Sequence, residues 1–346
     1  FETLPGAAER VCYPFGYGLS YTSFSLETVS AGESEGQIKG AVRVTNTGKR
    51  AGKEVVQLYY AAPWGELQKP ARCLGAFQKT RLLEPGESET VELSFAVSDM
   101  ASFDDLGKIA PSAWVLEKGR YDLYLGTSVR DAEKLDFAWE QAETETVRKC
   151  RNVLAPSHLK KRLLADGTWE DLPAAPAVDT DANVLEPLDP NTLEAVAPAV
   201  RARDRYLLSQ PYPEGVRPLS QAAEGKLALD AFMAQLSDED LIHLLGGQPN
   251  AGVSNTFGIG NLPEYGVPNI TTADGPAGLR IQPEVGVCTT AWPCATLLAA
   301  SWDEELVSKV GVAAAAEVKE NNISVWLAPA VNIHRSPLCG RNFEYD

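Results

Sequence analysis

Apolar and polar residues alternate in short runs between residues 24 and 139, which predicts a chain that begins with β-strands. The clearest runs cover residues 38–44, 55–60, 74–77, 91–95 and 121–125. Turn signals such as Asn46-Thr47-Gly48 and Pro85-Gly86 lie between the runs. Alternation with a period of two is typical of half-buried strands, and about seven short strands with regular turns predict a β-sandwich. Most aromatic residues here occupy alternating strand positions, so core packing is favoured over a carbohydrate-binding stripe.

The pattern changes after residue 140. Residues 141–222 are rich in Ala, Pro and Asp and have no sustained period, which is typical of a linker laid over surfaces. Helical periodicity returns at 224–236, and Ser237 is expected to cap a second short helix. The sequence Ser301-Trp302-Asp303-Glu304 matches a capping box and predicts a helix that runs to about Asn321.

The order strand, loop, helix, strand over 268–331 predicts the beginning of a parallel α/β barrel. A whole barrel needs about 250 residues, and this stretch supplies about half of that. We therefore expect three regions: a β-sandwich at 1–140, a linker at 141–222, and an incomplete (β/α)8-type barrel at 223–346.

Composition and charge exclude several classes of partner. The chain has 346 residues and a formal net charge of −16, so it has no basic excess to bind nucleic acid or an anionic membrane. No apolar run approaches the roughly 20 residues of a transmembrane helix. Phe1 is not an initiator Met, so we expect the chain to begin inside a larger gene product.

The six cysteines are dispersed, without a CxxC pair or a Cys/His cluster of metal-ligand spacing. The pattern predicts reduced and mostly buried thiols, no metal site, and a cytoplasmic location.

Charged residues follow two of the predicted barrel strands. Asp274 comes after the β-prone run 269–272, and Arg341 comes after the run 325–331. Carboxyl ends of neighbouring barrel strands share one pocket, so the two side chains are expected to face it together. Asp274 could accept two sugar hydroxyls, and Arg341 and Arg280 could donate forked hydrogen bonds. The simpler alternatives are a turn aspartate before Gly275 and an ion pair between Arg341 and Glu344.

Two short motifs resemble those of the family 3 glycoside hydrolases, the β-glucosidase family: DGPAGLR at 274–280 and CGRNFE at 339–344. The stretch 289–319 between them is also similar to that family. YPFGYGLSYTSF at 13–24 and VTNTGKRAGKEVVQLYY at 44–60 resemble the family's fibronectin-III-like domain. The fibronectin-like part precedes the barrel start here, as in the permuted minority of that family.

The resemblance implies a segment of a retaining, exo-acting β-glycosidase that hydrolyses terminal nonreducing β-D-glucosyl residues. It assigns sugar binding to Asp274, Arg280 and Arg341, and it implies no metal or organic cofactor. The family's nucleophile lies in a Ser/Thr-Asp-Trp motif that this chain lacks, and Ser301-Trp302-Asp303 is no substitute because its aspartate begins a helix. The family's acid/base Glu lies in a separate α/β sandwich domain. His334 and Arg335 are expected to be structural, and Trp292 and Trp326 to pack in the core.

The expected partners are therefore a β-glucoside or oligosaccharide substrate, the α/β sandwich domain and the rest of the barrel, with homo-oligomerisation left open. No catalytic residue is expected in this segment, and alone it is expected to be inactive. The alternative is a non-catalytic carbohydrate-binding or scaffolding protein that kept the fold and lost the chemistry. The preferred sugar and aglycone stay open.

Overall fold

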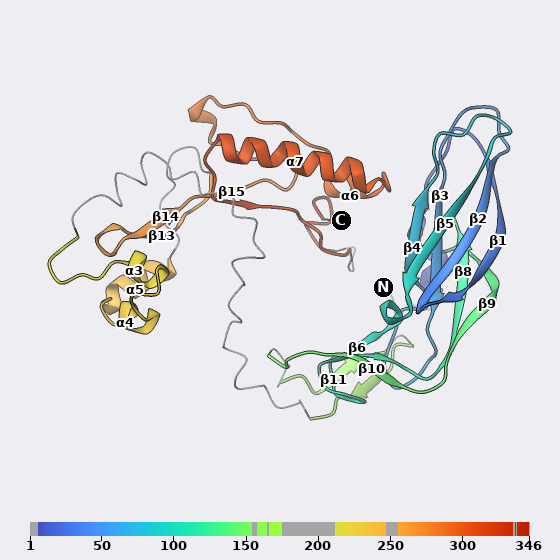
Figure 1. The fold of residues 1–346 in the computed structure, drawn as a ribbon, viewed down its shortest axis with the longest axis horizontal. Helices are drawn as coiled ribbons and strands as arrows, with labels where there is room; N and C mark the ends of the chain where they lie inside the picture. Colours follow the sequence, from blue (N-terminus) through green and yellow to red (C-terminus); the bar gives the residue numbers. More distant parts are fainter. Residues whose placement is uncertain are drawn as a thin grey trace. The chain divides into compact units, whose positions relative to one another are not determined.

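The computed structural model describes residues 6–153, 158–164, 166–174, 212–246, 255–334, 336 and 338–345. The chain forms two compact units, Phe1–Pro187 and Leu188–Asp346, which are described separately (Figure 1). The predicted division at 1–140, 141–222 and 223–346 stays a prediction. Of the predicted linker, residues 175–211 lie outside the described residues.

The sandwich of unit 1 consists of two antiparallel sheets. One has the strand order β1-β2-β5 and the other β4-β3-β8-β9. The strands of the first sheet are β1 (Phe24–Ser34), β2 (Gln37–Asn46) and β5 (Ser88–Ala96). Those of the second are β3 (Val55–Ala61), β4 (Cys73–Lys79), β8 (Gly119–Gly126) and β9 (Glu133–Gln141). The strands expected around 38–44, 55–60, 74–77, 91–95 and 121–125 are confirmed.

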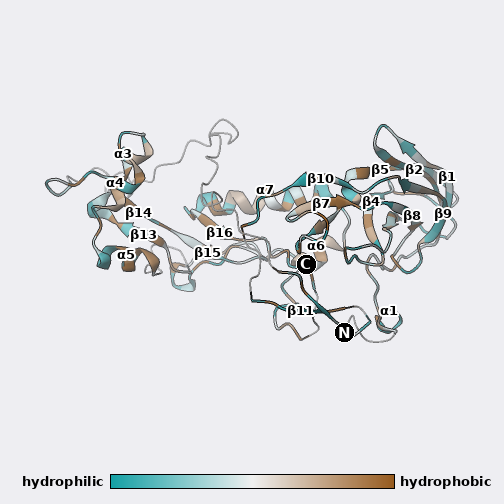
Figure 2. Ribbon diagram, turned by 90° about the horizontal axis from the view of Figure 1, so that it is seen from below, coloured by the Kyte–Doolittle hydropathy of each residue, from teal (hydrophilic) through white to brown (hydrophobic). Residues whose placement is uncertain are grey.

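A single apolar core joins the two sheets. Ile38 and Val42 of β2 are fully buried and belong to the same cluster as Leu58 of β3 and Tyr121 of β8. Burial alternates along β2, β5 and β8, so each sheet turns an apolar face to the other, whereas the interior residues of β3 are all buried (Figure 2 colours the strands by hydropathy). Tyr59 and Tyr121 are buried, in agreement with core packing for the strand aromatics.

A smaller sheet with the order β10-β7-β6 accompanies the sandwich. Its strands are β6 (Ser102–Asp104), β7 (Ala113–Leu116) and β10 (Glu145–Lys149), and a hairpin of β11 (Lys161–Leu163) and β12 (Trp169–Asp171) follows. Unit 1 also has the short helices α1 (Ala7–Arg10) and η1 (Val97–Met100). The described part of the predicted linker thus holds three strands, β10, β11 and β12. Strands this short show no alternation in the sequence. In β10, for example, Val147 is the single apolar residue, and it packs against the core.

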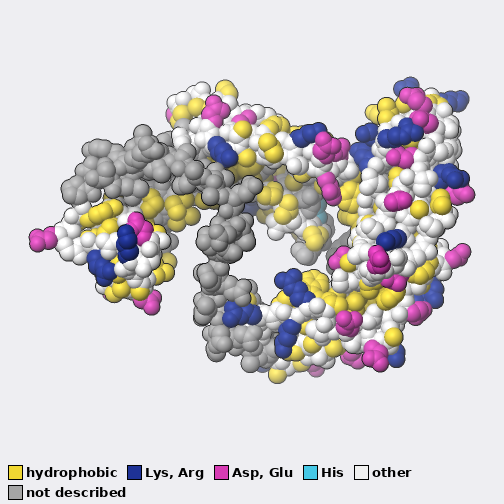
Figure 3. Space-filling view, in the orientation of Figure 1, with side chains coloured by type: hydrophobic (Ala, Val, Ile, Leu, Met, Phe, Trp, Pro, Cys, Tyr) yellow, Lys and Arg dark blue, Asp and Glu magenta, His cyan; other side chains and the backbone are white. Residues whose placement is uncertain are grey.

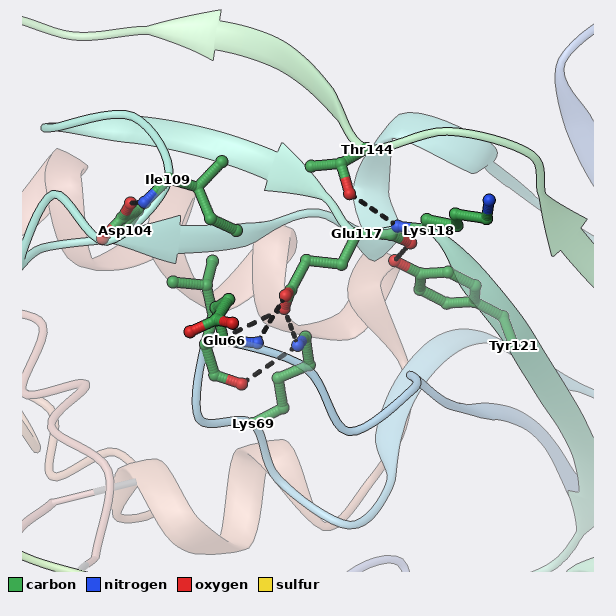
Figure 4. A network of polar contacts seen from close by, with 9 residues as sticks. Glu66, Lys69, Asp104, Ile109, Glu117, Lys118, Tyr121 and Thr144 are labelled. Carbon is green, nitrogen blue, oxygen red and sulfur yellow. Dashed lines mark hydrogen bonds and ion pairs between the residues drawn. The ribbon is translucent and has the colours of Figure 1, made fainter.

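Two buried carboxylates fix the loops around this smaller sheet (Figure 4). Glu117 pairs with Lys69 and accepts hydrogen bonds from the backbone nitrogen atoms of Glu66, at 2.7 Å, and of Leu67. Asp104 accepts four backbone N–H bonds from residues 107–110. Burial alone would raise the pKa of Asp104, but these four donors outweigh it and lower the pKa.

The described part of unit 2 starts at residue 212, and its first elements are three short helices and a hairpin. The helices are α3 (Leu219–Ala223), α4 (Leu229–Met233) and α5 (Asp238–Leu245), and the hairpin strands are β13 (Ile259–Leu262) and β14 (Val267–Ile270), joined by η3 (Pro263–Tyr265). Ser237 caps α5 as predicted, since its Oγ accepts from the Asp240 nitrogen atom. The helix expected at 224–236 is confined to α4, because Gly225, with φ +70°, ends the preceding turn of helix.

The second part of unit 2 is a β-α-β arrangement. β15 (Thr272–Asp274) pairs in parallel with β16 (Val325–Leu327). Between them lie η4 (Pro283–Val285), α6 (Ala295–Ala299) and α7 (Glu304–Glu320). None of the helices in the described ranges is long and apolar enough to cross a membrane.

Two expectations from the sequence are wrong in detail. Asp303, not Ser301, caps α7: its Oδ1 accepts from the Leu306 nitrogen atom at 3.0 Å. Ser301 instead closes α6, because its hydroxyl donates to the Leu298 carbonyl at 2.6 Å. The six cysteines are unpaired as expected, but four of them are exposed, since they lie in loops or at a helix cap: Cys12, Cys288, Cys294 and Cys339.

Candidate functional site

Asp274 lies where the sequence placed it, at the carboxyl end of β15. The parallel register sets Asp274 opposite Leu327, the last residue of β16. The loop that follows β15 and the loop that follows β16 therefore leave from the same edge of this pair of strands. Asp274 begins the first loop, and the second loop contains Arg341.

The loop 274–280 is a tight turn that depends on two glycines. Gly275 has φ +122° and Gly278 has φ +132°, conformations that side chains with a Cβ rarely adopt. A Cβ at Gly278 would collide with the carbonyl oxygen of Thr290. The turn is closed by two backbone bonds: the Gly278 nitrogen donates to the Gly275 carbonyl at 3.1 Å, and the Arg280 nitrogen donates to the Asp274 carbonyl at 3.0 Å. This closure brings the side chain of Arg280 back toward Asp274.

Arg280 and Asp274 form an ion pair. The distance from Arg280 Nη1 to Asp274 Oδ2 is 3.0 Å, and the two side chains are 63% and 32% exposed. One carboxylate oxygen is therefore engaged, while the carboxylate as a whole stays accessible. A partly exposed carboxylate with a fixed guanidinium partner can accept further hydrogen bonds from hydroxyl groups.

Arg341 forms a second ion pair, with Glu344. Its Nε and Nη2 each donate to one Glu344 carboxylate oxygen at 2.7 Å, and its guanidinium lies 5.2 Å from the ring centroid of Tyr345. The bonds from Arg341 lower the pKa of Glu344, and the charge of Arg280 lowers it further. The hydrogen bond to Glu344 raises the pKa of Arg341, to which the charge of Asp274 also contributes. The alternative weighed for Arg341, pairing with Glu344, is thus present in the structure.

The three residues predicted for the site, Asp274, Arg280 and Arg341, are accordingly within electrostatic reach of one another. His334 Nε2 lies 2.9 Å from the Tyr345 carbonyl oxygen, which also accepts from Thr296 Oγ1 at 2.7 Å, so His334 helps to hold the second loop. Arg335 lies outside the described residues. Among the described residues, no three His, Cys, Asp or Glu side chains are grouped so that they could hold a metal ion.

Two contacts at Asp274 had no signal in the sequence. Asn255 Oδ1 accepts from the Asp274 nitrogen atom, and the Trp326 indole donates to the Gly275 carbonyl.

Unit 1 has a groove of 530 Å³ between β1 and β9. It is lined by Thr28, Ala31 and residues 134–137. The ammonium group of Lys134 in this groove is already paired with Asp122 at 2.6 Å.

Charged side chains are dispersed elsewhere. On the face shown in Figure 3, acidic and basic groups alternate over unit 1, without the basic stripe that a nucleic-acid interface requires.

Known proteins share both parts of this architecture. A fibronectin type III-like family model matches residues 54–129, within the sandwich. The whole chain aligns with β-glucosidase A of Butyrivibrio fibrisolvens at 54% identity and with a β-glucosidase of Ruminococcus albus at 37% identity. The chain spans 44% of the first relative and 35% of the second.

A solved β-glucosidase from Paenibacillus barengoltzii superimposes on 97% of the chain with a TM-score of 0.68 and 38% identity, and the match covers 37% of that structure. The chain is thus similar along its length to glycoside hydrolases, and part of its sandwich matches a fibronectin type III-like domain. More specifically, these relatives are β-glucosidases, which confirms the resemblance of the chain to glycoside hydrolase family 3.

Proposed function

We propose that this chain is a segment of a retaining, exo-acting β-glycosidase that removes terminal nonreducing β-D-glucosyl residues. The observation that carries the proposal is the ion pair between Asp274 and Arg280 at the end of β15, where the charge of Asp274 also acts on Arg341. The relatives named as β-glucosidases, aligned over the whole chain, support it.

In this proposal the three side chains bind the terminal sugar. Asp274 accepts hydrogen bonds from two hydroxyl groups, since a carboxylate has two oxygen atoms and only one is bonded to Arg280. Arg280 and Arg341 donate to further sugar oxygens, and the hydrogen bonds from Arg341 also lower the pKa of Glu344. No metal or organic cofactor is part of this site.

The parallel β15-α7-β16 unit is proposed to be the start of a (β/α)8-type barrel, which would span 223–346 and continue outside the chain. Binding at the carboxyl ends of its strands is the usual arrangement in such barrels. The permuted order of domains belongs to the same proposal.

Hydrolysis with retention needs two carboxyl groups about 5–5.5 Å apart, one as nucleophile and one as acid/base. The sugar-binding carboxylate cannot serve as nucleophile while it holds two hydroxyls. We therefore assign both catalytic groups to the remaining parts of the enzyme, which would be a further part of the barrel and an α/β sandwich domain.

The test is Asp274→Asn in the full-length enzyme, assayed on aryl β-glycosides. The amide keeps the shape but places a donor where an acceptor is needed, and charge-assisted bonds are worth about 1.5–3 kcal/mol each. We expect kcat/KM to fall at least about a hundredfold, equivalent to about 2.7 kcal/mol.

A folded Asp274→Asn variant with wild-type kinetics would reduce Asp274 to a turn residue. A full-length wild type that binds glucosides without cleaving any of them would instead favour the non-catalytic carbohydrate-binding alternative.

A further inference from the structure

Three backbone groups at Asp274 and Gly275 form hydrogen bonds, each with a different part of the chain. The Asp274 nitrogen donates to Asn255 Oδ1 at 3.0 Å. The Asp274 carbonyl accepts from the Arg280 nitrogen at 3.0 Å, and the Gly275 carbonyl accepts from Trp326 Nε1 at 3.0 Å. The peptide units before and after Asp274 are therefore each fixed by a hydrogen bond.

Asn255 belongs to a segment that is itself attached to β15. The Thr256 hydroxyl donates to the Thr272 carbonyl at 2.7 Å, and the Thr272 hydroxyl donates to the Phe257 carbonyl at 2.6 Å. Thr272 is buried, so these bonds are shielded from water. The amide of Asn255 thus reaches Asp274 from a fixed starting point.

Trp326 approaches from the other side, from the neighbouring strand β16. It pairs with Ala273 in the register and packs against the small core of Ala273, Leu279 and Ile323. An indole is a donor with a single N–H, and here that N–H is directed to the Gly275 carbonyl.

The bond to Gly275 matters because glycine restrains its own backbone least of all residues. Gly275 has φ +122° and directly follows the carboxylate residue, so rotation there would turn the Asp274 carboxylate away from its partner. A rigid indole from a neighbouring strand supplies the restraint that the glycine lacks.

We infer that Asn255 and Trp326 are positioning residues that hold the Asp274 backbone on both sides and thereby orient its carboxylate for the sugar. The inference rests on the proposed function of Asp274. Displacement of a ligand-holding group by about 1 Å can cost a large factor in rate, which is why such groups are supported by a second layer of hydrogen bonds.

The first test is kinetic and uses the full-length protein with the variants Trp326→Phe and Asn255→Ala. Each removes one hydrogen bond, and we expect each to lower kcat/KM about fivefold. In an Asp274→Asn background the same changes should cost less than about twofold, because the charge-assisted bonds they orient are already lost. A merely structural role would give equal losses in both backgrounds.

The second test does not depend on activity. Amide hydrogen exchange of the peptide that covers 272–280 should become at least about tenfold faster in both variants, because the restraints on Asp274 and Gly275 are removed. Matched controls are Trp292→Phe, whose indole N–H is without a partner among the described residues, and Asn321→Ala, whose amide donates to Glu317 of its own helix.

Wild-type exchange and kinetics in both variants would overturn the inference. Equal losses in the wild-type and Asp274→Asn backgrounds would overturn it as well. Faster exchange in the variants of a full-length protein that has no glycosidase activity would support the positioning of Asp274 and refute the proposed function.

Discussion

At the scale of single residues, the site contains two ion pairs that differ in exposure. In the Arg341–Glu344 pair the guanidinium is 60% exposed and the carboxylate only 14%, so the more protected partner is the acid. Arg341 contacts both carboxylate oxygens and leaves part of its planar fork directed to solvent. This geometry suits a guanidinium that serves a carboxylate and a ligand oxygen together.

We therefore predict that Arg341→Lys will not rescue Arg341→Ala in the full-length enzyme. An ammonium is a point charge on a shorter reach and cannot form the two parallel bonds to Glu344. Both variants should lose at least about tenfold in kcat/KM, to be measured together with the melting temperature. If Lys restores both quantities to near wild type, Arg341 supplies only positive charge and its role as a shaped sugar-site residue is refuted.

At the scale of elements, a buried ion pair joins loops of unit 1. Lys69, in the segment between β3 and β4, and Glu117, in the turn between β7 and β8, are 3% and 6% exposed. The Tyr121 hydroxyl donates to the Glu117 carbonyl at 3.0 Å, four residues back. A tyrosine bonded to the backbone just upstream is similar to the tyrosine corner of immunoglobulin-like sandwiches. Glu117 thus fixes the turn before β8 in two ways: its carboxylate pairs with Lys69, and its backbone carbonyl accepts from Tyr121.

We predict that Glu117→Gln will destabilise unit 1 by about 3–5 kcal/mol, because it leaves the buried Lys69 ammonium without its counter-charge. The double variant Lys69→Met, Glu117→Gln should recover most of that loss, since it removes both charges and keeps a side-chain oxygen that can accept from the backbone nitrogen atoms of Glu66 and Leu67. Urea unfolding followed by fluorescence measures the effect. Glu27→Gln, which breaks the exposed pair with Arg43, is the control and should be silent. A Glu117→Gln variant as stable as this control would show that Lys69 is solvated.

Features that depend on residues close together in the sequence could be predicted, and contacts between residues far apart in the sequence could not. Strands such as β2 were predictable because alternation is local, and Ser237 was predictable because its capping partner Asp240 is three residues away. Ser301 matched the same local rule but was engaged by Leu298 on its other side, which left Asp303 as the cap. The bonds from Asn255 and Trp326 span 19 and 51 residues and leave no periodic trace. The β-sandwich and the placement of Asp274 at a strand end were therefore accessible from the sequence, and the contacts that support Asp274 were not.

At the scale of the whole molecule, the chain covers under half of the length of its curated relatives. We predict that the chain alone will not hydrolyse an aryl β-glucoside at a rate within about a thousandfold of an intact relative, because nucleophile and acid/base are assigned elsewhere. The assay compares the purified chain with the full-length protein at equal concentration. Turnover close to that of the intact enzyme would mean that a catalytic carboxylate lies within these residues.

The extent of the sandwich has a practical consequence for domain excision. The family match covers 54–129, but β1, β2 and β9 lie outside it. A protein trimmed to the match would lack the buried residues Ile38, Val42 and Val44, and the Gln57 amide would lose the Gly16 carbonyl to which it donates at 3.1 Å. The inner face of the second sheet would then be open to water, and such a fragment would accumulate as insoluble protein in an expression host. Cloning boundaries near residues 14 and 150 keep both sheets together and retain β10, whose Val147 packs against the core.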